Sequence, residues 1–246
     1  MKTLKDQLVG LDPRFNYRGL NQTRVETFSD AVFAFAFTLV VLSSSVPETF
    51  TELKASLREI IPFLICIVLI VVIWYQHYIF FLRYGLQNTR TVVINTFLLF
   101  LLLIYVYPLK FLASFLFELY AGLITGDSAK FNEQYVPDMD GNFLMTSYGI
   151  GATLIFLTIA LLYKHAISKR EELGLNKYEV FATKNSCVHN LLMASVPFLS
   201  FIISVSKIFG DSPVNVIVAG FIYMLYIPVM FGYGWIVKRK LRRLDF

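Results

Sequence analysis

Six long runs of apolar residues dominate this chain of 246 residues, and each run is close to the length that crosses a bilayer. An α-helix needs about 20 consecutive apolar residues to span the hydrocarbon core of a membrane. The runs are continuous and do not alternate between apolar and polar residues, so they predict helices and not the strands of a barrel. We expect spans at 28–46, 60–82, 91–117, 143–163, 187–206 and 213–237. The sequence therefore predicts an all-α membrane protein with six transmembrane helices.

Basic residues predict the orientation of these spans. Most of the 22 Lys and Arg residues lie before the first span, in the second and fourth connections, and after the last span. Basic residues are retained on the cytoplasmic side, so we expect both termini in the cytoplasm. The net charge of +5 then reflects membrane orientation and not a nucleic-acid partner.

We expect one domain, 1–246, with three polar parts outside the bilayer. These are a cytoplasmic N-terminal arm at 1–27, an acidic extracellular segment at 118–142 and a basic cytoplasmic tail at 238–246. The acidic segment is either a solvated loop or a surface that concentrates cations at an outer mouth.

Enzymatic motifs are missing from the sequence. It has no HExxH, GxSxG, P-loop or Rossmann pattern, so we expect neither an enzyme nor a bound cofactor. Cys66 and Cys187 lie in different spans without the spacing of a metal site, and we expect both to be free thiols.

Polar side chains recur at one depth, in the inner third of the bilayer. Asp30 lies near the start of the first span, and His77 lies near the inner end of the second. Asn95 lies near the start of the third, and Asn190 begins the fifth. Such groups are costly in a membrane unless they face protein or water. We expect a buried network with Ser29 that fixes the rotation of the first helix, and the alternative is a proton relay between Asp30 and His77.

One stripe of the first span places a hydroxyl half-way across the membrane. Steps of three and four residues put five side chains on this stripe: Ala31, Phe35, Thr38, Leu42 and Ser45. Thr38 has bulky apolar residues one turn away on either side. A threonine in a membrane helix commonly bonds back to its own backbone, so Thr38 either has that structural role or lines a pore.

Three motifs resemble the transmembrane protein 175 family of potassium channels, and specifically its prokaryotic, single-repeat branch. They are RxxxFSD at Arg24, Phe28, Ser29 and Asp30, WxxHxxxF at Trp74, His77 and Phe81, and Asn95 followed by Pro108. The motifs cover the first three spans, at about 24–111, whereas the last three spans match mainly by number and length.

The resemblance implies a homotetramer in the prokaryotic plasma membrane, with the first helices around a central pore. It implies that one set of residues holds the pore helix in register: Arg24, Phe28, Ser29, Asp30, His77 and Asn95. It also implies apolar constrictions in place of a TVGYG filter, and this chain has no TVGYG. The family often has isoleucine at the innermost constriction, where this chain has Phe35.

The resemblance favours the pore interpretation, with Phe35, Thr38, Leu42 and Ser45 lining the pore and potassium passing near Thr38. Apolar rings would force partial dehydration, which costs potassium less than sodium, so the expected selectivity is modest. The expected partners are the lipid bilayer and copies of the same chain. The alternative function is a proton-coupled secondary transporter that uses Asp30 and His77. Transporters often have internal repeats and broken helices, and neither is visible here.

Overall fold

The structure is a computed structural model that describes residues 12–42, 47–137, 140–210 and 213–243. Within these ranges the chain forms helices and short connections, and no strand occurs. Six helical segments are long and apolar enough to cross a membrane. The predicted all-α fold with six spans is confirmed.

The helices coincide with the apolar runs. The first five spans are α1 (Arg24–Leu42), α3 (Ile60–Tyr84), α4 (Thr89–Thr125), α6 (Gly141–Ser168) and α7 (Lys177–Ser206). The sixth consists of α8 (Pro213–Phe221), the 3-10 turn η2 (Ile222–Leu225) and α9 (Tyr226–Arg243). Two short helices that were not predicted, α2 (Phe50–Arg58) and α5 (Ala129–Tyr135), lie in the connections.

The sixth span is interrupted where the sequence predicts a continuous helix. Pro228 has no backbone N–H, and its ring clashes with the carbonyl four residues earlier in an α-helix. That carbonyl belongs to Met224, which lies in η2. The tighter 3-10 turn is thus found where proline makes regular α-helix unfavourable.

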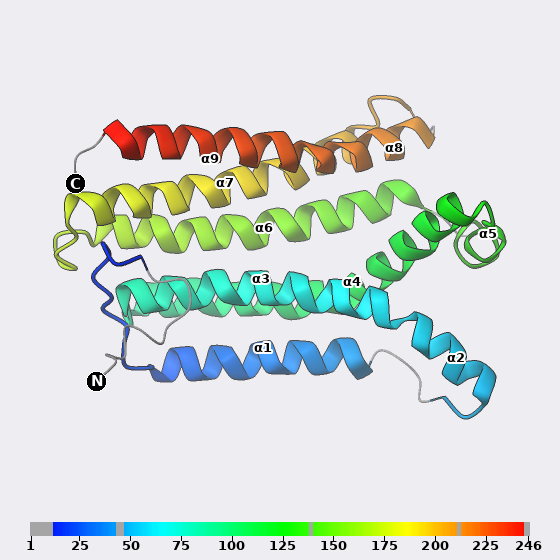
Figure 1. Ribbon diagram of the computed structural model, residues 1–246, viewed down its shortest axis with the longest axis horizontal. Coiled ribbons are helices and arrows are strands. Elements are labelled where there is room, and N and C mark those ends of the chain that lie inside the picture. The colour runs from blue at the N-terminus through cyan, green and yellow to red at the C-terminus, as the bar shows by residue number, and fades with distance from the viewer. Residues whose placement is uncertain (1–11, 43–46, 138–139, 211–212, 244–246) are drawn as a thin grey trace.

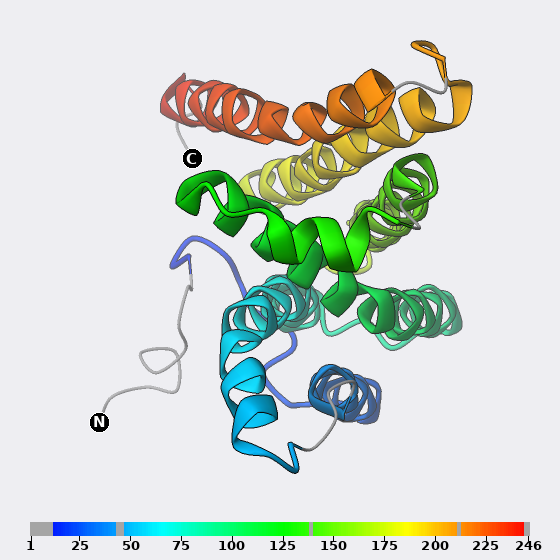
Figure 2. The same ribbon diagram turned by 90° about the vertical axis from the view of Figure 1, so that its right-hand side faces the viewer.

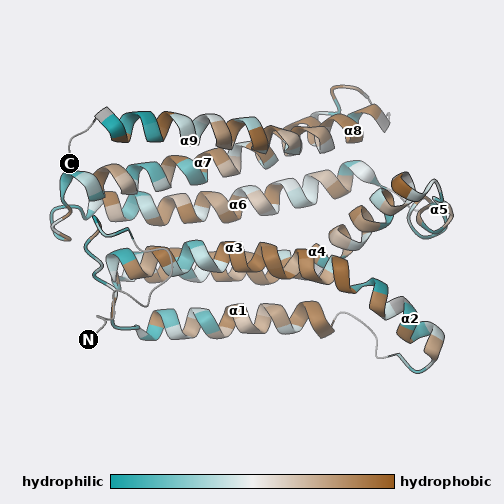
Figure 3. Ribbon diagram, in the orientation of Figure 1, coloured by the Kyte–Doolittle hydropathy of each residue, from teal (hydrophilic) through white to brown (hydrophobic). Residues whose placement is uncertain are grey.

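The helices are arranged in layers that run from α1 to α9. α1 lies at one edge, α3 and α4 come next, α6 and α7 follow, and α8 with α9 forms the opposite edge (Figures 1 and 2). α1 begins and α9 ends at the same end of the bundle. Hydrophobic residues fill α1 and α3 from the middle to their right-hand ends, whereas hydrophilic residues gather at the left-hand end of α1 and in α2 (Figure 3).

The core lies where α1 meets α3 and α4, and it continues into α6. Phe33, Ala36 and Val40 of α1 belong to it together with Ile70 of α3 and Leu102 of α4. Each of these five residues is at most 1% exposed. Among the described helices, α1 packs only against α3 and α4, so a single face attaches it to the subunit.

The two cysteines lie on different helices. Cys66 on α3 is buried, Cys187 on α7 is partly buried, and both are free, as expected.

The segment before α1 closes the end of α3. The Arg18 amide donates to the Arg83 carbonyl at 3.4 Å, and the Gly19 amide donates to the Leu82 carbonyl at 3.1 Å. The last carbonyls of a helix have no hydrogen-bond donor within the helix. This segment supplies the donors for two of the last carbonyls of α3. Only glycine fits at position 19, because a Cβ there would lie 2.1 Å from the Phe81 carbonyl oxygen.

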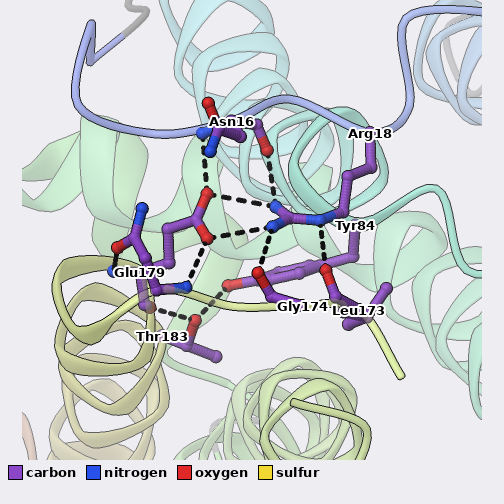
Figure 4. Close-up of polar contacts among 8 residues, drawn as sticks. Asn16, Arg18, Tyr84, Leu173, Gly174, Glu179 and Thr183 are labelled. Carbon is purple, nitrogen blue, oxygen red and sulfur yellow. Dashed lines mark hydrogen bonds and ion pairs between the residues drawn. The ribbon is translucent and has the colours of Figure 1, made fainter. Parts of the chain in front are cut away.

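Arg18 is partly exposed and joins the same segment to α7 through an ion pair with buried Glu179 (Figure 4). Its guanidinium donates to the two oxygens of Glu179 at 3.1 and 2.9 Å. It also donates to the carbonyls of Leu173 and Gly174 at 2.7 and 3.2 Å. The Glu179 side chain is fully buried and accepts a further bond from the Asn16 amide at 2.7 Å. The buried charge therefore has the charged and neutral partners that burial requires.

Asp12 provides a second contact to α7. Its carboxylate accepts hydrogen bonds from Arg14 at 3.0 Å and from the Tyr178 hydroxyl. Burial acts to raise the pKa of Asp12, but the hydrogen bonds from Arg14 and Tyr178 outweigh burial and lower the pKa to about 2. Since this pKa is below the ordinary value for aspartate, the contribution to stability is present at neutral pH and is lost as the pH falls toward 2.

Replacing Glu179 with alanine should destabilise the fold, because the Arg18 charge would lose its buried partner. Loss of one member of a buried pair costs about 3–5 kcal/mol, so Glu179→Ala should lower the midpoint of thermal unfolding of the purified protein in detergent by several degrees. The control is Lys169→Ala, which breaks the exposed pair between Lys169 and Glu172 and should cost at most about 1 kcal/mol. Equal shifts for the two variants would contradict a structural role for the buried pair.

Candidate functional site

α1 begins at a capping box, which sets the depth of every residue that follows. The Thr23 amide donates to the Glu26 carboxylate at 2.8 Å, and the Glu26 amide donates to the Thr23 hydroxyl at 3.2 Å. The two residues reciprocally satisfy donors that have no partner within the helix. The start of α1 is therefore fixed by its own sequence.

A chain of hydrogen bonds joins α3, α4 and α1. His77 Nε2 lies 2.9 Å from Asn95 Oδ1, and Asn95 Nδ2 donates to Ser29 Oγ at 2.8 Å. Ser29 Oγ donates in turn to the Val25 carbonyl at 2.7 Å. Because an amide oxygen can only accept, His77 must carry a proton on Nε2 and donate it. The donors point in one direction, from α3 through α4 to α1.

These three side chains are shielded from solvent. Ser29, His77 and Asn95 are at most 2% exposed. The rings of Phe33 and Phe81 have centroids 5.5 and 4.7 Å from that of His77. In such an apolar site, an unpaired polar group would cost more than it does in water. The structure thus brings together three of the predicted network residues.

Asp30 does not take part in the hydrogen bonds between His77, Asn95 and Ser29, and it bonds to other residues. Its Oδ1 accepts from the indole Nε1 of Trp74 at 2.9 Å, and its Oδ2 accepts from the side-chain amide of Gln22 at 3.0 Å. The expected single network is therefore two separate groups of bonds, in which Asp30 and His77 have different partners.

Sequence reasoning assigned no hydrogen-bonding role to Trp74 or Gln22. The available signal for Trp74 was its position three residues before His77, because residues three apart lie on one face of a helix. Gln22 precedes the capping residue of α1 and had no comparable signal.

The remaining members of the predicted set do not join these bonds. Arg24 and Phe28 are exposed, and Phe28 is 62% exposed. Asn190 is buried on α7, where its Nδ2 donates to the Ser186 carbonyl at 2.9 Å. The sequence placed Asn190 at the same depth as Ser29, His77 and Asn95, but in the fold Asn190 does not bond to these residues.

The stripe of α1 proposed from the sequence faces away from the rest of the subunit. Phe35 and Leu42 are 54% and 71% exposed, and Thr38 is exposed as well. Successive residues of an α-helix are turned by about 100°, so this row lies nearly opposite the buried row of Ser29, Phe33, Ala36 and Val40. Ser45 lies outside the described residues.

The Thr38 hydroxyl donates to the Ala34 carbonyl at 3.1 Å. The bond of Thr38 to its own helix, which the sequence left open, is therefore present. This bond uses the hydroxyl proton and leaves the lone pairs of the oxygen available. The back-bond is consequently compatible with an oxygen that also contacts a cation.

The fold and these contacts define a multi-pass helical membrane protein whose first three spans are linked by side-chain hydrogen bonds. The family described as endosomal/lysosomal potassium channel TMEM175 matches residues 24–108. A protein of Marivirga tractuosa named as a potassium channel is 52% identical over 247 residues, which cover 99% of each chain. The chain belongs to the TMEM175 family, in its prokaryotic branch.

Solved structures agree with this assignment. One is the crystal structure of a T38A variant of the potassium channel MtTMEM175 bound to a nanobody–MBP fusion. It matches this chain with a TM-score of 0.83 and 53% sequence identity, and the match covers 94% of this chain and 100% of that one. A protein from Chamaesiphon minutus, described as a homologue of the lysosomal potassium-selective channel TMEM175, has a TM-score of 0.50 at 22% identity. That second match covers 82% of this chain and 95% of the other, and it shows the fold alone.

We predict that Ser29 and Asn95 act as a unit in holding α1. Asn95→Leu should lower the free energy of unfolding by about 1–3 kcal/mol, because it leaves buried partners unpaired. Ser29→Ala should have a smaller effect. The double variant should lower the free energy of unfolding by less than the sum of the two single variants, since both single variants remove the same hydrogen bond between Asn95 and Ser29. Denaturation of the purified proteins in detergent measures all three values. Strictly additive costs would show that the two residues do not depend on each other.

Proposed function

We propose that this chain forms a potassium channel in the prokaryotic plasma membrane, in which four copies surround a central pore lined by α1. The observation that carries the proposal is the exposed row of Phe35, Thr38 and Leu42 in a member of this family. The opposite face of α1 is used by α3 and α4 of the same chain. The exposed row is thus available to α1 of other copies, and a closed ring of copies encloses a path that a single helix cannot.

Charge supports an orientation with both chain ends in the cytoplasm. α1 starts and α9 ends at one end of the bundle, where Arg24, Lys238 and Lys240 belong to the basic segments. At the other end lies α5, which belongs to the acidic segment, and its Lys130 is paired to Glu118. Retention of basic residues in the cytoplasm places the acidic segment outside.

In this arrangement, potassium passes Thr38 between two apolar rings. The Thr38 hydroxyls provide weak oxygen ligands, because their protons are used within the helix and their lone pairs are free. Phe35 and Leu42 narrow the path and force partial loss of water, which costs potassium less than sodium. Few replacement ligands are available, so the preference for potassium is modest, and a narrow apolar ring can close the path by dewetting.

The alternative of a proton-coupled transporter has less support. It needs proton exchange between Asp30 and His77, which bond to different residues. Flux through reconstituted protein distinguishes the two functions, because a channel conducts potassium without a coupled ion.

Replacing Thr38 with alanine should weaken the preference for potassium over sodium. The variant removes the polar group midway along the exposed row and leaves the apolar rings that define the path. Reversal potentials of single channels in mixed potassium and sodium solutions should move toward equal permeability, while current remains. Unchanged reversal potentials would remove Thr38 from the selectivity mechanism.

Replacing Leu42 with asparagine should increase current and reduce selectivity, because a polar ring holds water where an apolar ring excludes it. Each reduction of about 1.4 kcal/mol in the barrier raises the rate tenfold. The matched control is Val41→Asn, which introduces the same side chain one position away, on the adjacent face. An increase in current with Val41→Asn and none with Leu42→Asn would show that the pore has been assigned to the wrong face of α1.

A further inference from the structure

A cavity of about 450 Å³ lies between α7 and α9, far from the exposed face of α1. Its α9 wall includes Met230, Gly234 and Lys238, which recur every four residues and therefore share one face. Its α7 wall includes Asn185, His189 and Asn190, and α3 and α6 complete the lining. None of these residues takes part in the bonds that hold α1.

The polar wall of this cavity is unusual for a transmembrane helix. Three of the four α7 residues that line it carry amide or imidazole groups, and the fourth is Ser186. Hydrophilic patches are visible in this half of α7 (Figure 3). Polar side chains inside a membrane protein are costly and usually serve a site or a water-filled space. In this wall the Ser186 hydroxyl accepts from Arg83 at 3.1 Å, and the Asn185 carbonyl accepts from the Tyr233 hydroxyl at 2.9 Å, so these polar groups are bonded within the protein.

One polar group of the cavity lacks a partner. Asn190 is 1% exposed, and its Oδ1 has no hydrogen-bond partner among the described residues. The Nδ2 of the same carboxamide is held by the Ser186 carbonyl at 2.9 Å, and at 1.5 Å per residue Asn190 lies about 12 Å deeper in the bundle than Lys238. At the cytoplasmic end, Lys238 supplies a positive charge. The complementary molecule therefore carries an anionic group at this end of the cavity.

The position of the cavity identifies the source of such a molecule. α9 lies at the edge of the subunit opposite α1 (Figures 1 and 2), so a ring of copies around α1 leaves α9 at the periphery, beside lipid. Met230 and Val237 give the cavity an apolar side. Lys238 follows directly on the apolar part of α9, at the depth where basic side chains reach lipid headgroups.

We propose that this cavity binds the headgroup of an anionic glycerophospholipid of the inner leaflet. The phosphate lies beside Lys238, and the acyl chains run along the apolar side of the cavity. A soluble glycerol phosphate offers the same chemistry, but it lacks the acyl chains that fit the apolar side. The lipid site does not depend on ion conduction, so it can be tested by binding alone.

Glycine residues of α9 provide a matched pair of variants. A Cβ added at Gly234 or at Gly232 meets no atom within 4 Å. Gly234 lines the cavity and Gly232 does not. Gly234→Leu therefore fills the cavity, whereas Gly232→Leu makes the same change of side chain and of helix propensity outside it.

Lys238 and Lys240 give a second matched pair. Both are exposed on α9, but only Lys238 lines the cavity. Lys238→Gln and Lys240→Gln remove the same charge from the same helix. Because a basic residue near anionic lipid contributes about 1 kcal/mol, Lys238→Gln should weaken binding by about fivefold.

The test is native mass spectrometry of the intact purified channel with phosphatidylglycerol, phosphatidylcholine or glycerol 3-phosphate. We expect one phosphatidylglycerol per subunit on the parent, Gly232→Leu and Lys240→Gln proteins. Gly234→Leu should abolish this binding, and phosphatidylcholine should bind weakly. Equal retention of phosphatidylglycerol by the Gly234→Leu and parent proteins would overturn the proposal. Binding of glycerol 3-phosphate in place of the lipid would overturn it as well. Lys238→Gln keeps the test valid if the leucine variant fails to assemble.

Discussion

Apolar packing cannot by itself decide which face of α1 meets the subunit, because the surrounding lipid is as apolar as the core. The buried face of α1 is distinguished by Ser29, whose hydroxyl connects to Asn95 and through it to His77. A rotation of α1 by one residue would turn its faces by about 100° and leave these groups unpaired. The hydrogen-bond chain therefore accounts for the outward direction of Phe35, Thr38 and Leu42, on which the proposed pore depends.

The start of α1 is tied to the rest of the subunit in a different way. The chain before it closes the end of α3 and is paired through Arg18 to buried Glu179 of α7. The first three spans and the last three are thereby joined by polar contacts at one end of the bundle. Such contacts depend on exact donors and acceptors, whereas the apolar core tolerates volume-conserving exchange.

Spans and local motifs could be predicted from the sequence because they follow from the length of apolar runs and from short spacings. The contact of Ser29, His77 and Asn95 was expected, because depth in the bilayer places polar residues at one level. Depth does not determine which side of a helix a residue occupies, so Asn190 was grouped with residues that it does not contact. The pairing of Arg18 with Glu179 spans 161 residues, and no local pattern indicates it.

Cysteine accessibility along α1 tests most directly whether the row containing Thr38 faces the ion path. Single cysteines would replace Ala31, Phe35, Thr38 and Leu42 on one face, and Phe33, Ala36 and Val40 on the other, in a channel without Cys66 and Cys187. A cationic thiol reagent should change the potassium current at positions of the first set and leave the second set unaffected. Modification confined to the second set, or equal on both faces, would contradict the orientation of α1.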